Sequence, residues 1–155
     1  MDVYLMQHGE ALPAELDPSR SLSEVGQRSV EVVSRHAAAC GVRVDRIVHS
    51  GKLRAVESAL ILARALGCAD VGHVEGLAPG ADVEAAVAAL IDQSVVGSLA
   101  IVGHLPFLDR LASALITGDP GAHVLAVRNG GLVKLVPAER GWAVAWAITP
   151  EVARG

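Results

Sequence analysis

Near its start the chain carries the stretch Val3-Tyr4-Leu5-Met6-Gln7-His8-Gly9-Glu10-Ala11, in which a polar turn follows directly after an apolar run. The run from Val3 to Met6 has the composition of a buried β-strand. Gly9 allows the backbone to turn sharply where that strand ends. We therefore expect His8 at a strand end, where its imidazole can be exposed in a pocket and take part in chemistry.

Predicted strands and helices alternate along most of the chain. The pattern predicts a surface loop over residues 12–20, strands over 46–49, 71–74 and 98–102, a helix capped by Ser23 and ended by Gly41, a helix over 52–66, a helix capped by Asp82, and a helix bearing Leu108, Leu111 and Leu115. This alternation is typical of a mainly parallel sheet covered by helices on both faces. We expect one α/β domain over residues 1–155, a three-layer α/β/α sandwich.

The end of the chain has a different pattern. Residues 124–127, 132–136 and 142–148 are predicted strands, and the last two are joined through a short Pro- and Gly-containing turn. Their close spacing predicts an antiparallel hairpin at an edge of the sheet. Trp142 and Trp146 are expected to pack on the same face of the last strand, because side chains an even number of residues apart share a face.

Composition narrows the classes of partner and compartment. The 155 residues carry a formal net charge of −4, without a basic block, so we expect neither nucleic acid nor a membrane as the partner. Neither a signal peptide nor an apolar run of membrane-spanning length is recognisable. Cys40 and Cys68 lack metal-ligand spacing and are expected to be buried, unpaired thiols in a reducing cytoplasm. No signal of oligomeric state is present.

Chemically active residue types follow three of the predicted strands. The first strand is followed by Gln7, His8, Gly9 and Glu10, the second by His49, Ser50, Gly51 and Arg54, and the fourth by Gly103, His104 and Pro106. Ligands of open α/β sheets bind beyond the carboxyl ends of the strands, so these residues should share one site. A guanidinium in the first turn of a helix suits a phosphoryl group, and a neutral imidazole can act as a nucleophile or a hydrogen-bond donor.

The same motifs carry a family resemblance. His8-Gly9-Glu10, Ser50-Gly51-Lys52-Leu53-Arg54-Ala55 and Gly103-His104-Leu105-Pro106 resemble the motifs of the histidine phosphatase superfamily, and the short chain is similar to its SixA-type phosphohistidine phosphatase branch. Arg20-Ser21-Leu22-Ser23-Glu24-Val25-Gly26, Leu77-Ala78-Pro79-Gly80-Ala81-Asp82 and the segment ending at Asn129-Gly130-Gly131-Leu132 extend the resemblance. It implies a phosphoglycerate mutase-like fold and a hydrolase that needs neither metal nor organic cofactor.

The resemblance also implies a role for each residue. His8 would be the nucleophile that forms a phosphohistidine intermediate, Arg54 would hold the phosphoryl oxygens, and His104 would donate a hydrogen bond to them. Gly9 and Gln7 would also lie at the phosphate. The superfamily normally has arginine at the position of Gln7, so the missing charge should weaken phosphate binding by about 1–3 kcal/mol.

The general acid is left open by the sequence. Some relatives have aspartate after the second histidine, but here Leu105 follows His104. Glu10 and Glu75 remain as candidates. The absence of a dedicated acid fits a phosphohistidine substrate, because imidazole is a basic leaving group that can be protonated before it leaves.

Together with the resemblance, these residues imply a phosphohistidine phosphatase acting on a phosphohistidine-containing phosphotransfer protein. Two alternatives remain open, a phosphatase for a small phosphorylated metabolite and a catalytically weak phosphate- or phosphoprotein-binding module. A zinc site formed by His8, His49 and His104 is disfavoured, because Arg54 would repel the metal ion.

Overall fold

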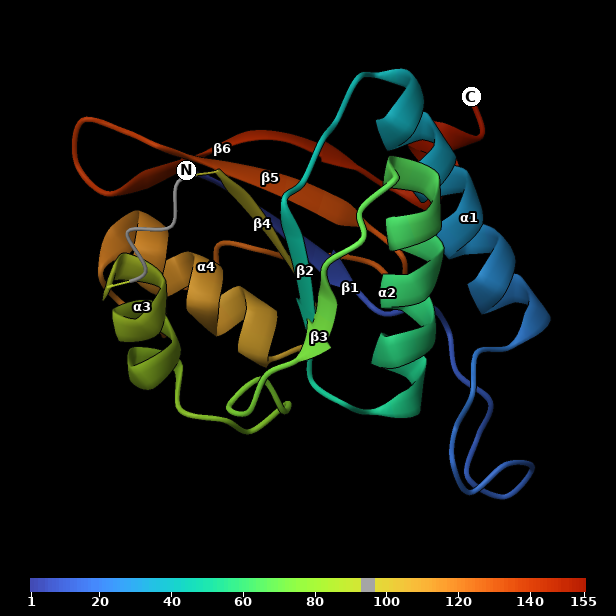
Figure 1. Cartoon of the computed structure of the whole chain (residues 1–155). Helices are drawn as coiled ribbons and strands as arrows, with labels where there is room; N and C mark the ends of the chain where they lie inside the picture. The colour runs from blue at the N-terminus through green and yellow to red at the C-terminus, as the bar shows by residue number, and fades with distance from the viewer. Residues whose placement is uncertain (93–96) are drawn as a thin grey trace.

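A mixed six-stranded sheet lies between two layers of helices (Figure 1). The structure is a computed structural model that describes residues 1–92 and 97–155. The strands are β1 (Asp2–Gln7), β2 (Arg46–His49), β3 (Val71–His73), β4 (Ser98–Gly103), β5 (Leu132–Pro137) and β6 (Trp142–Ile148). The helices are α1 (Glu24–Ala39), α2 (Leu53–Leu66), α3 (Val83–Asp92), α4 (Phe107–Thr117) and α5 (Pro150–Ala153).

The strand order β3-β2-β4-β1-β5-β6 confirms the predicted three-layer α/β fold. The first four strands in this order run parallel to one another, whereas β5 is antiparallel to β1 and β6 is antiparallel to β5. The predicted antiparallel hairpin at the sheet edge is thus present. Because β1, β2, β3 and β4 are parallel, their carboxyl ends meet at one edge, and the turn before β5 lies at that edge too.

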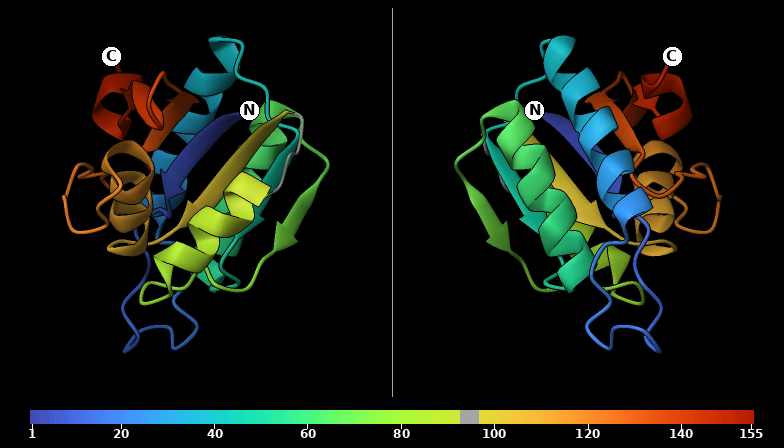
Figure 2. Two further views of the ribbon diagram at one scale, coloured as in Figure 1. Left: turned by 90° about the vertical axis from the view of Figure 1, so that its left-hand side faces the viewer. Right: turned by 90° about the vertical axis from the view of Figure 1, so that its right-hand side faces the viewer.

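Each face of the sheet packs against its own pair of long helices. Figure 2 shows α1 and α2 on one side of the sheet and α3 and α4 on the other. In β1, Tyr4 and Met6 belong to the core beneath α1 and α2, while Val3 and Leu5 belong to the core beneath α3 and α4. Burial on both faces explains why the strand is a continuous apolar run and does not alternate with polar residues.

The start of α1 is shaped by its contact with the loop after β1. The Ser23 hydroxyl oxygen accepts a hydrogen bond from Gly26 N at 3.0 Å, which confirms Ser23 as the N-cap. Gly26 is an unusual residue for a first helical turn, and a Cβ atom there would collide with the backbone carbonyl oxygen of Glu10. The close approach requires glycine and holds the loop after His8 against the helix.

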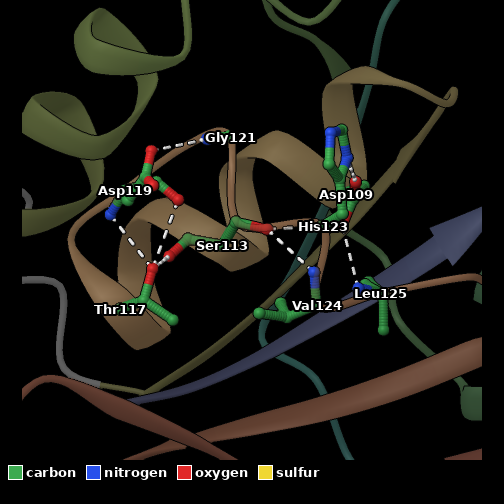
Figure 3. Close-up of polar contacts among 8 residues, drawn as sticks. All are labelled: Asp109, Ser113, Thr117, Asp119, Gly121, His123, Val124 and Leu125. Carbon is green, nitrogen blue, oxygen red and sulfur yellow. Dashed lines mark hydrogen bonds and ion pairs between the residues drawn. The ribbon is translucent and has the colours of Figure 1, made fainter.

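Residues 124–127 do not form the predicted strand. The Leu125 backbone N–H donates to Asp109 Oδ1 at 2.8 Å, and the Val124 N–H donates to Ser113 Oγ at 3.2 Å (Figure 3). Side chains of α4 therefore satisfy backbone donors that a strand would have paired with a neighbouring strand. The segment is irregular because it is bonded to a helix and not to the sheet.

The two tryptophans face opposite sides of β6, contrary to the sequence prediction. Lys134 pairs with Trp146, but the next residue, Leu135, pairs with Val144, so β6 contains one extra residue as a β-bulge. The bulge reverses the alternation of side chains beyond it. Trp146 accordingly packs with the core beneath α1 and α2, and Trp142 with the core beneath α3 and α4.

The structure also bears on the two cysteines and on the length of the helices. Both cysteines are free thiols, but Cys40 is exposed at the C-cap of α1, so the prediction of buried thiols is wrong for it. Cys68 is half-buried. Within residues 1–92 and 97–155, every helix is too short or too polar to cross a lipid bilayer.

Candidate active site

The carboxyl edge of the sheet brings together His8, Arg54 and His104. The imidazole centroids of His8 and His104 lie 5.0 Å apart, with their planes inclined at 57°. The His8 backbone N–H donates to Gly103 O at 3.0 Å, which ties the residue after β1 to the end of β4. Arg54 stands in the first turn of α2, close enough for its charge to lower the pKa of both imidazoles. These three sequence-predicted residues form one cluster.

The hydrogen bond of His8 defines its tautomer. His8 Nδ1 lies 2.6 Å from the backbone oxygen of Gly9. A carbonyl oxygen only accepts, so Nδ1 carries the proton and Nε2 keeps a free lone pair. Burial lowers the pKa of His8 below 6.5; the Gly9 bond opposes this shift, and the charges of Arg54 and Arg20 add to it. At neutral pH, His8 is an uncharged imidazole, and its Nε2 has no hydrogen-bond partner among the described residues.

Ser58 connects the loop after His8 to the helix that carries Arg54. The Gly9 N–H donates to Ser58 Oγ at 3.0 Å, and this hydroxyl donates to Arg54 O at 2.7 Å. Ser58 is fully buried. A Cβ atom on Gly9 would lie 2.7 Å from Gly26 O, so only glycine fits between the loop and α1. The chain thus positions the imidazole of His8 relative to the guanidinium of Arg54 through buried contacts.

His104 is a neutral, buried imidazole with one free nitrogen. Its Nε2 lies 2.6 Å from Ser50 Oγ, and its Nδ1 is buried without a hydrogen-bond partner in the described part of the chain. Burial, together with the charges of His8, Arg54 and Lys52, lowers the pKa of His104 to about 3. If the Ser50 hydroxyl donates to Nε2, the proton of the neutral ring resides on Nδ1. The buried Nδ1–H would then be a donor without an acceptor among the described residues.

Arg20 adds a second guanidinium to the site, which the sequence did not identify as a site residue. It lies in an arm formed by residues 11–22, which projects beyond the sheet edge (Figure 1) and is closed by a bridge between Ala11 and Leu22. Its positive φ of 52° turns the chain back, and its Nε donates to Leu12 O at 3.2 Å. Its charge lowers the pKa of His8 and of Arg54, so it adds to the positive potential at these residues. The sequence placed Arg20 only in a motif before α1, and its position in space depends on how the arm folds.

The electrostatics of this cluster favour an anion. Arg54 has a buried Nε without an acceptor among the described residues, and burial followed by the Arg20 charge lowers the pKa of its guanidinium. Within the described chain, neither Arg54 nor Arg20 forms an ion pair with a carboxylate. Two nearby unpaired guanidinium groups and two neutral imidazoles match the charge and the acceptors of a phosphoryl group.

Gln7 is buried beside this cluster and pairs with Asn129. Its Nε2 donates to Asn129 Oδ1 at 2.8 Å, although the two residues are 122 positions apart. Asn129 stands in the turn before β5, and the sequence marked it only as part of a motif, not as a site residue. The Asn-Gly pair before an apolar strand signals a turn, but not the partner of its side chain. Phosphate binding by Gln7 stays a prediction.

The remaining sequence candidates lie at the rim or outside the cluster. Glu10 is exposed and accepts a hydrogen bond from Ser23 Oγ at 3.2 Å, and the Glu75 side chain is 95% exposed. His49 stacks on His73, with centroids 6.1 Å apart, and does not join His8 and His104. No three His, Cys, Asp or Glu residues in the described ranges are placed to hold a metal ion.

Comparison with known proteins gives both sequence and structural relatives. No family model matches the chain. An uncharacterised protein from Picosynechococcus sp. strain PCC 7002 is 31% identical over 141 residues, which cover 87% of this chain and 84% of that protein. This similarity extends over nearly the whole domain.

Solved structures share the fold over almost their full length. The protein histidine phosphatase SixA in complex with tungstate has a TM-score of 0.84 at 24% identity, with 97% of each chain covered. A protein from Agrobacterium tumefaciens assigned as the phosphohistidine phosphatase SixA has a TM-score of 0.79 at 27% identity, over 96% of this chain and 97% of that one. In its fold and in the motif residues that it brings to the sheet edge, the chain is similar to these members of the histidine phosphatase superfamily, and these structural neighbours are phosphatases.

Proposed function

We propose that the chain is a phosphohistidine phosphatase that acts on a phosphorylated protein through a covalent intermediate on His8. The observation that supports the proposal is the neutral His8, whose Nδ1 is bonded to Gly9 O, whose ring lies beside that of His104, and whose pKa is lowered by the charges of Arg54 and Arg20. A nucleophile and a binding site for a phosphoryl anion are thus combined. A histidine-containing phosphotransfer protein in the cytoplasm is the proposed partner.

In the first step the His8 Nε2 lone pair attacks phosphorus. The Nε2–P bond forms as the P–N bond to the substrate imidazole breaks, and the leaving ring retains the bonding electron pair. When the other nitrogen of that ring already carries a proton, it leaves as neutral imidazole and needs no acid. Arg54 and Arg20 balance the charge on the phosphoryl oxygens, and the neutral imidazole of His104 donates a hydrogen bond to one of them.

In the second step water attacks the phosphorus bound to His8. The Nε2–P bond breaks, Nε2 regains its lone pair, and both protons of the water remain on the released phosphate before it ionises. The bond from His8 Nδ1–H to Gly9 O persists through both steps, so the ring begins and ends as the same tautomer. Neither step requires Glu10 or Glu75, and replacement of Glu10 by glutamine should leave turnover of phosphohistidine largely intact.

The test compares a protein labelled with ³²P on histidine with small phosphoesters as substrates. We expect acid-labile, base-stable label on His8 during turnover of the phosphoprotein, and loss of both label and turnover in His8→Ala. His36→Ala, a change of a half-buried histidine on α1, is the matched control. Turnover that survives His8→Ala would overturn the mechanism, and faster turnover of a small phosphoester would favour a metabolite phosphatase.

One observation favours a second function, a phosphate- or phosphoprotein-binding module. The superfamily position usually held by arginine carries Gln7, whose amide nitrogen already donates to Asn129. A site with this weaker set of donors could bind the anion and turn over slowly. Saturable binding of phosphate or vanadate, combined with no release of phosphate from any phosphoprotein or phosphoester, would identify such a module.

A further inference from the structure

The side chains of Gln7 and Asn129 face each other in a preorganised arrangement. Gly131 N donates to Arg128 O at 2.8 Å, which closes a β-turn with Asn129 and Gly130 at its centre. Gly130 has a φ of 81°, as the third residue of a type II turn requires, and its N–H donates to Gln7 O at 2.9 Å. The backbone therefore holds the turn against the end of β1, and the two carboxamides meet without an ordering step.

One atom of this pair has no partner. Gln7 is only 9% exposed, and its Oε1 is buried without a hydrogen bond from any described residue. An unpaired carbonyl oxygen in such surroundings is unfavourable, because it has lost its hydration without compensation. Gln7 is the last residue of β1, directly before the proposed nucleophile, and so stands at the carboxyl edge of the sheet.

The pair has a second arrangement with the same number of hydrogen bonds. Terminal amide torsions have broad, roughly two-fold profiles, so each carboxamide can rotate by about 180°. After both rotations Asn129 Nδ2 donates to Gln7 Oε1, and the whole NH₂ group of Gln7 becomes free. The two arrangements differ in the unpaired group of Gln7, which is an acceptor in one and a donor in the other.

A phosphoryl group distinguishes the two arrangements. Its oxygens are acceptors, so they are repelled by a free carbonyl oxygen and bound by a free NH₂ group. A ligand shifts a two-state equilibrium toward the state that it binds better. We propose that Gln7 and Asn129 form an amide switch, in which Asn129 accepts from Gln7 in the resting site and donates to it when a phosphoryl group is bound, freeing Gln7 to donate to that group.

Asn129 is thus a positioning residue for the reaction, and Gln7 is the group that contacts the phosphoryl oxygen. This inference rests on the proposed function, because it requires phosphoryl binding at His8. It accounts for how the site can use glutamine at a position where the superfamily normally places arginine. An asparagine partner can both accept and donate, which neither a carboxylate nor an apolar side chain can do.

Side-chain amide NMR on the wild-type protein tests the switch directly. We expect vanadate to shift the NH₂ resonances of both Gln7 and Asn129 and to slow hydrogen exchange of the Asn129 NH₂ group, which becomes a hydrogen-bond donor. Gln7→Met and Asn129→Leu assign the two signals. Unchanged Asn129 exchange at saturating vanadate would overturn the switch, because the pair would then be static.

Vanadate affinity in a double-mutant cycle gives an independent measurement. Gln7→Met and Asn129→Leu should each weaken binding at least about five-fold, and the double variant should be no weaker than Gln7→Met alone, because the two side chains act as a unit. Gln27→Met, a change of an exposed glutamine on α1, should have no effect. Losses that multiply, or no loss in either single variant, would overturn the inference while leaving the phosphate site intact. Absence of vanadate binding in the wild type would overturn the proposed function itself.

Discussion

Replacement of Ser58 by alanine tests how the nucleophile loop is held against the helix that carries Arg54. Ser58 Oγ accepts from Gly9 N at 3.0 Å and donates to Arg54 O at 2.7 Å, and the side chain is fully buried. Arg54 O retains its helical backbone bond in the variant. Gly9 N, which is also buried, loses its hydrogen-bond partner.

The loss of stability follows from these two bonds. An unsatisfied buried N–H costs about 1–3 kcal/mol, whereas the bond to the already paired Arg54 carbonyl contributes less. We expect Ser58→Ala to lower the free energy of unfolding by about 2 kcal/mol. For a chain of this size, that corresponds to a decrease of about 4–8 °C in Tm. Turnover should also fall, because Gly9 accepts the hydrogen bond that sets the tautomer of His8.

Ser34→Ala is a matched control for this measurement. Ser34 also lies on a helix and is fully buried, but its Oγ has no hydrogen-bond partner in the described structure. Its removal should leave the free energy of unfolding within about 0.5 kcal/mol of the wild type, or raise it. Thermal unfolding by calorimetry and turnover of a phosphohistidine protein measure both variants. Equal decreases in Tm for the two variants, or no decrease for Ser58→Ala, would refute the reasoning.

Three further predictions concern the imidazoles and α4. In an NMR titration, His8 should protonate with a midpoint below 6.5, and His104 with a midpoint of about 3. Both pKa values are lower in the folded than in the unfolded protein, so the free energy of unfolding should fall as the pH decreases from 6.5. A midpoint at or above 6.5 for either histidine would contradict this. Ser50→Ala should lower kcat for the phosphohistidine protein about ten-fold or more, because His104 loses the bond at Nε2 that orients its ring; an unchanged kcat would exclude that role. Asp109→Ala should lower the free energy of unfolding by about 1–3 kcal/mol, since it leaves backbone and side-chain donors unpaired (Figure 3). Asp119→Ala, a change at an exposed turn, should alter it by less than about 0.5 kcal/mol. Equal losses for the two variants in chemical denaturation would argue against a stabilising role of the hydrogen bonds to Asp109.

The sequence predicted the elements whose signals are local. The apolar run of β1, the N-cap Ser23 and the periodic apolar face of α2 are read within a few neighbouring residues, and the structure confirms these elements. Alternation of strands and helices then implies parallel strands, whose carboxyl ends must share an edge. For that physical reason the sequence could also group His8, Arg54 and His104 in one site.

Features that depend on distant partners were not predictable in the same way. Residues 124–127 have strand-like composition, but Asp109 and Ser113 of α4 supply the partners of their backbone donors. The bulge in β6 follows from its pairing with β5, and it separates two tryptophans whose spacing indicates a shared face. In both places, pairing across the fold overrides a local pattern.

By itself, the sequence determined the fold class, the order of the elements and the edge of the sheet where the chemistry lies, because these depend on hydrophobic periodicity and chain direction. Only the tertiary structure decided the state of the groups at that edge. The proton position on His8 depends on the carbonyl of Gly9, and the donor of Gln7 is directed by Asn129, 122 positions away. The fold of residues 11–22 brings Arg20 close enough for its charge to lower the pKa of His8. Hydrogen bonds and charges act over a few ångströms in space, and folding alone determines which groups come that close.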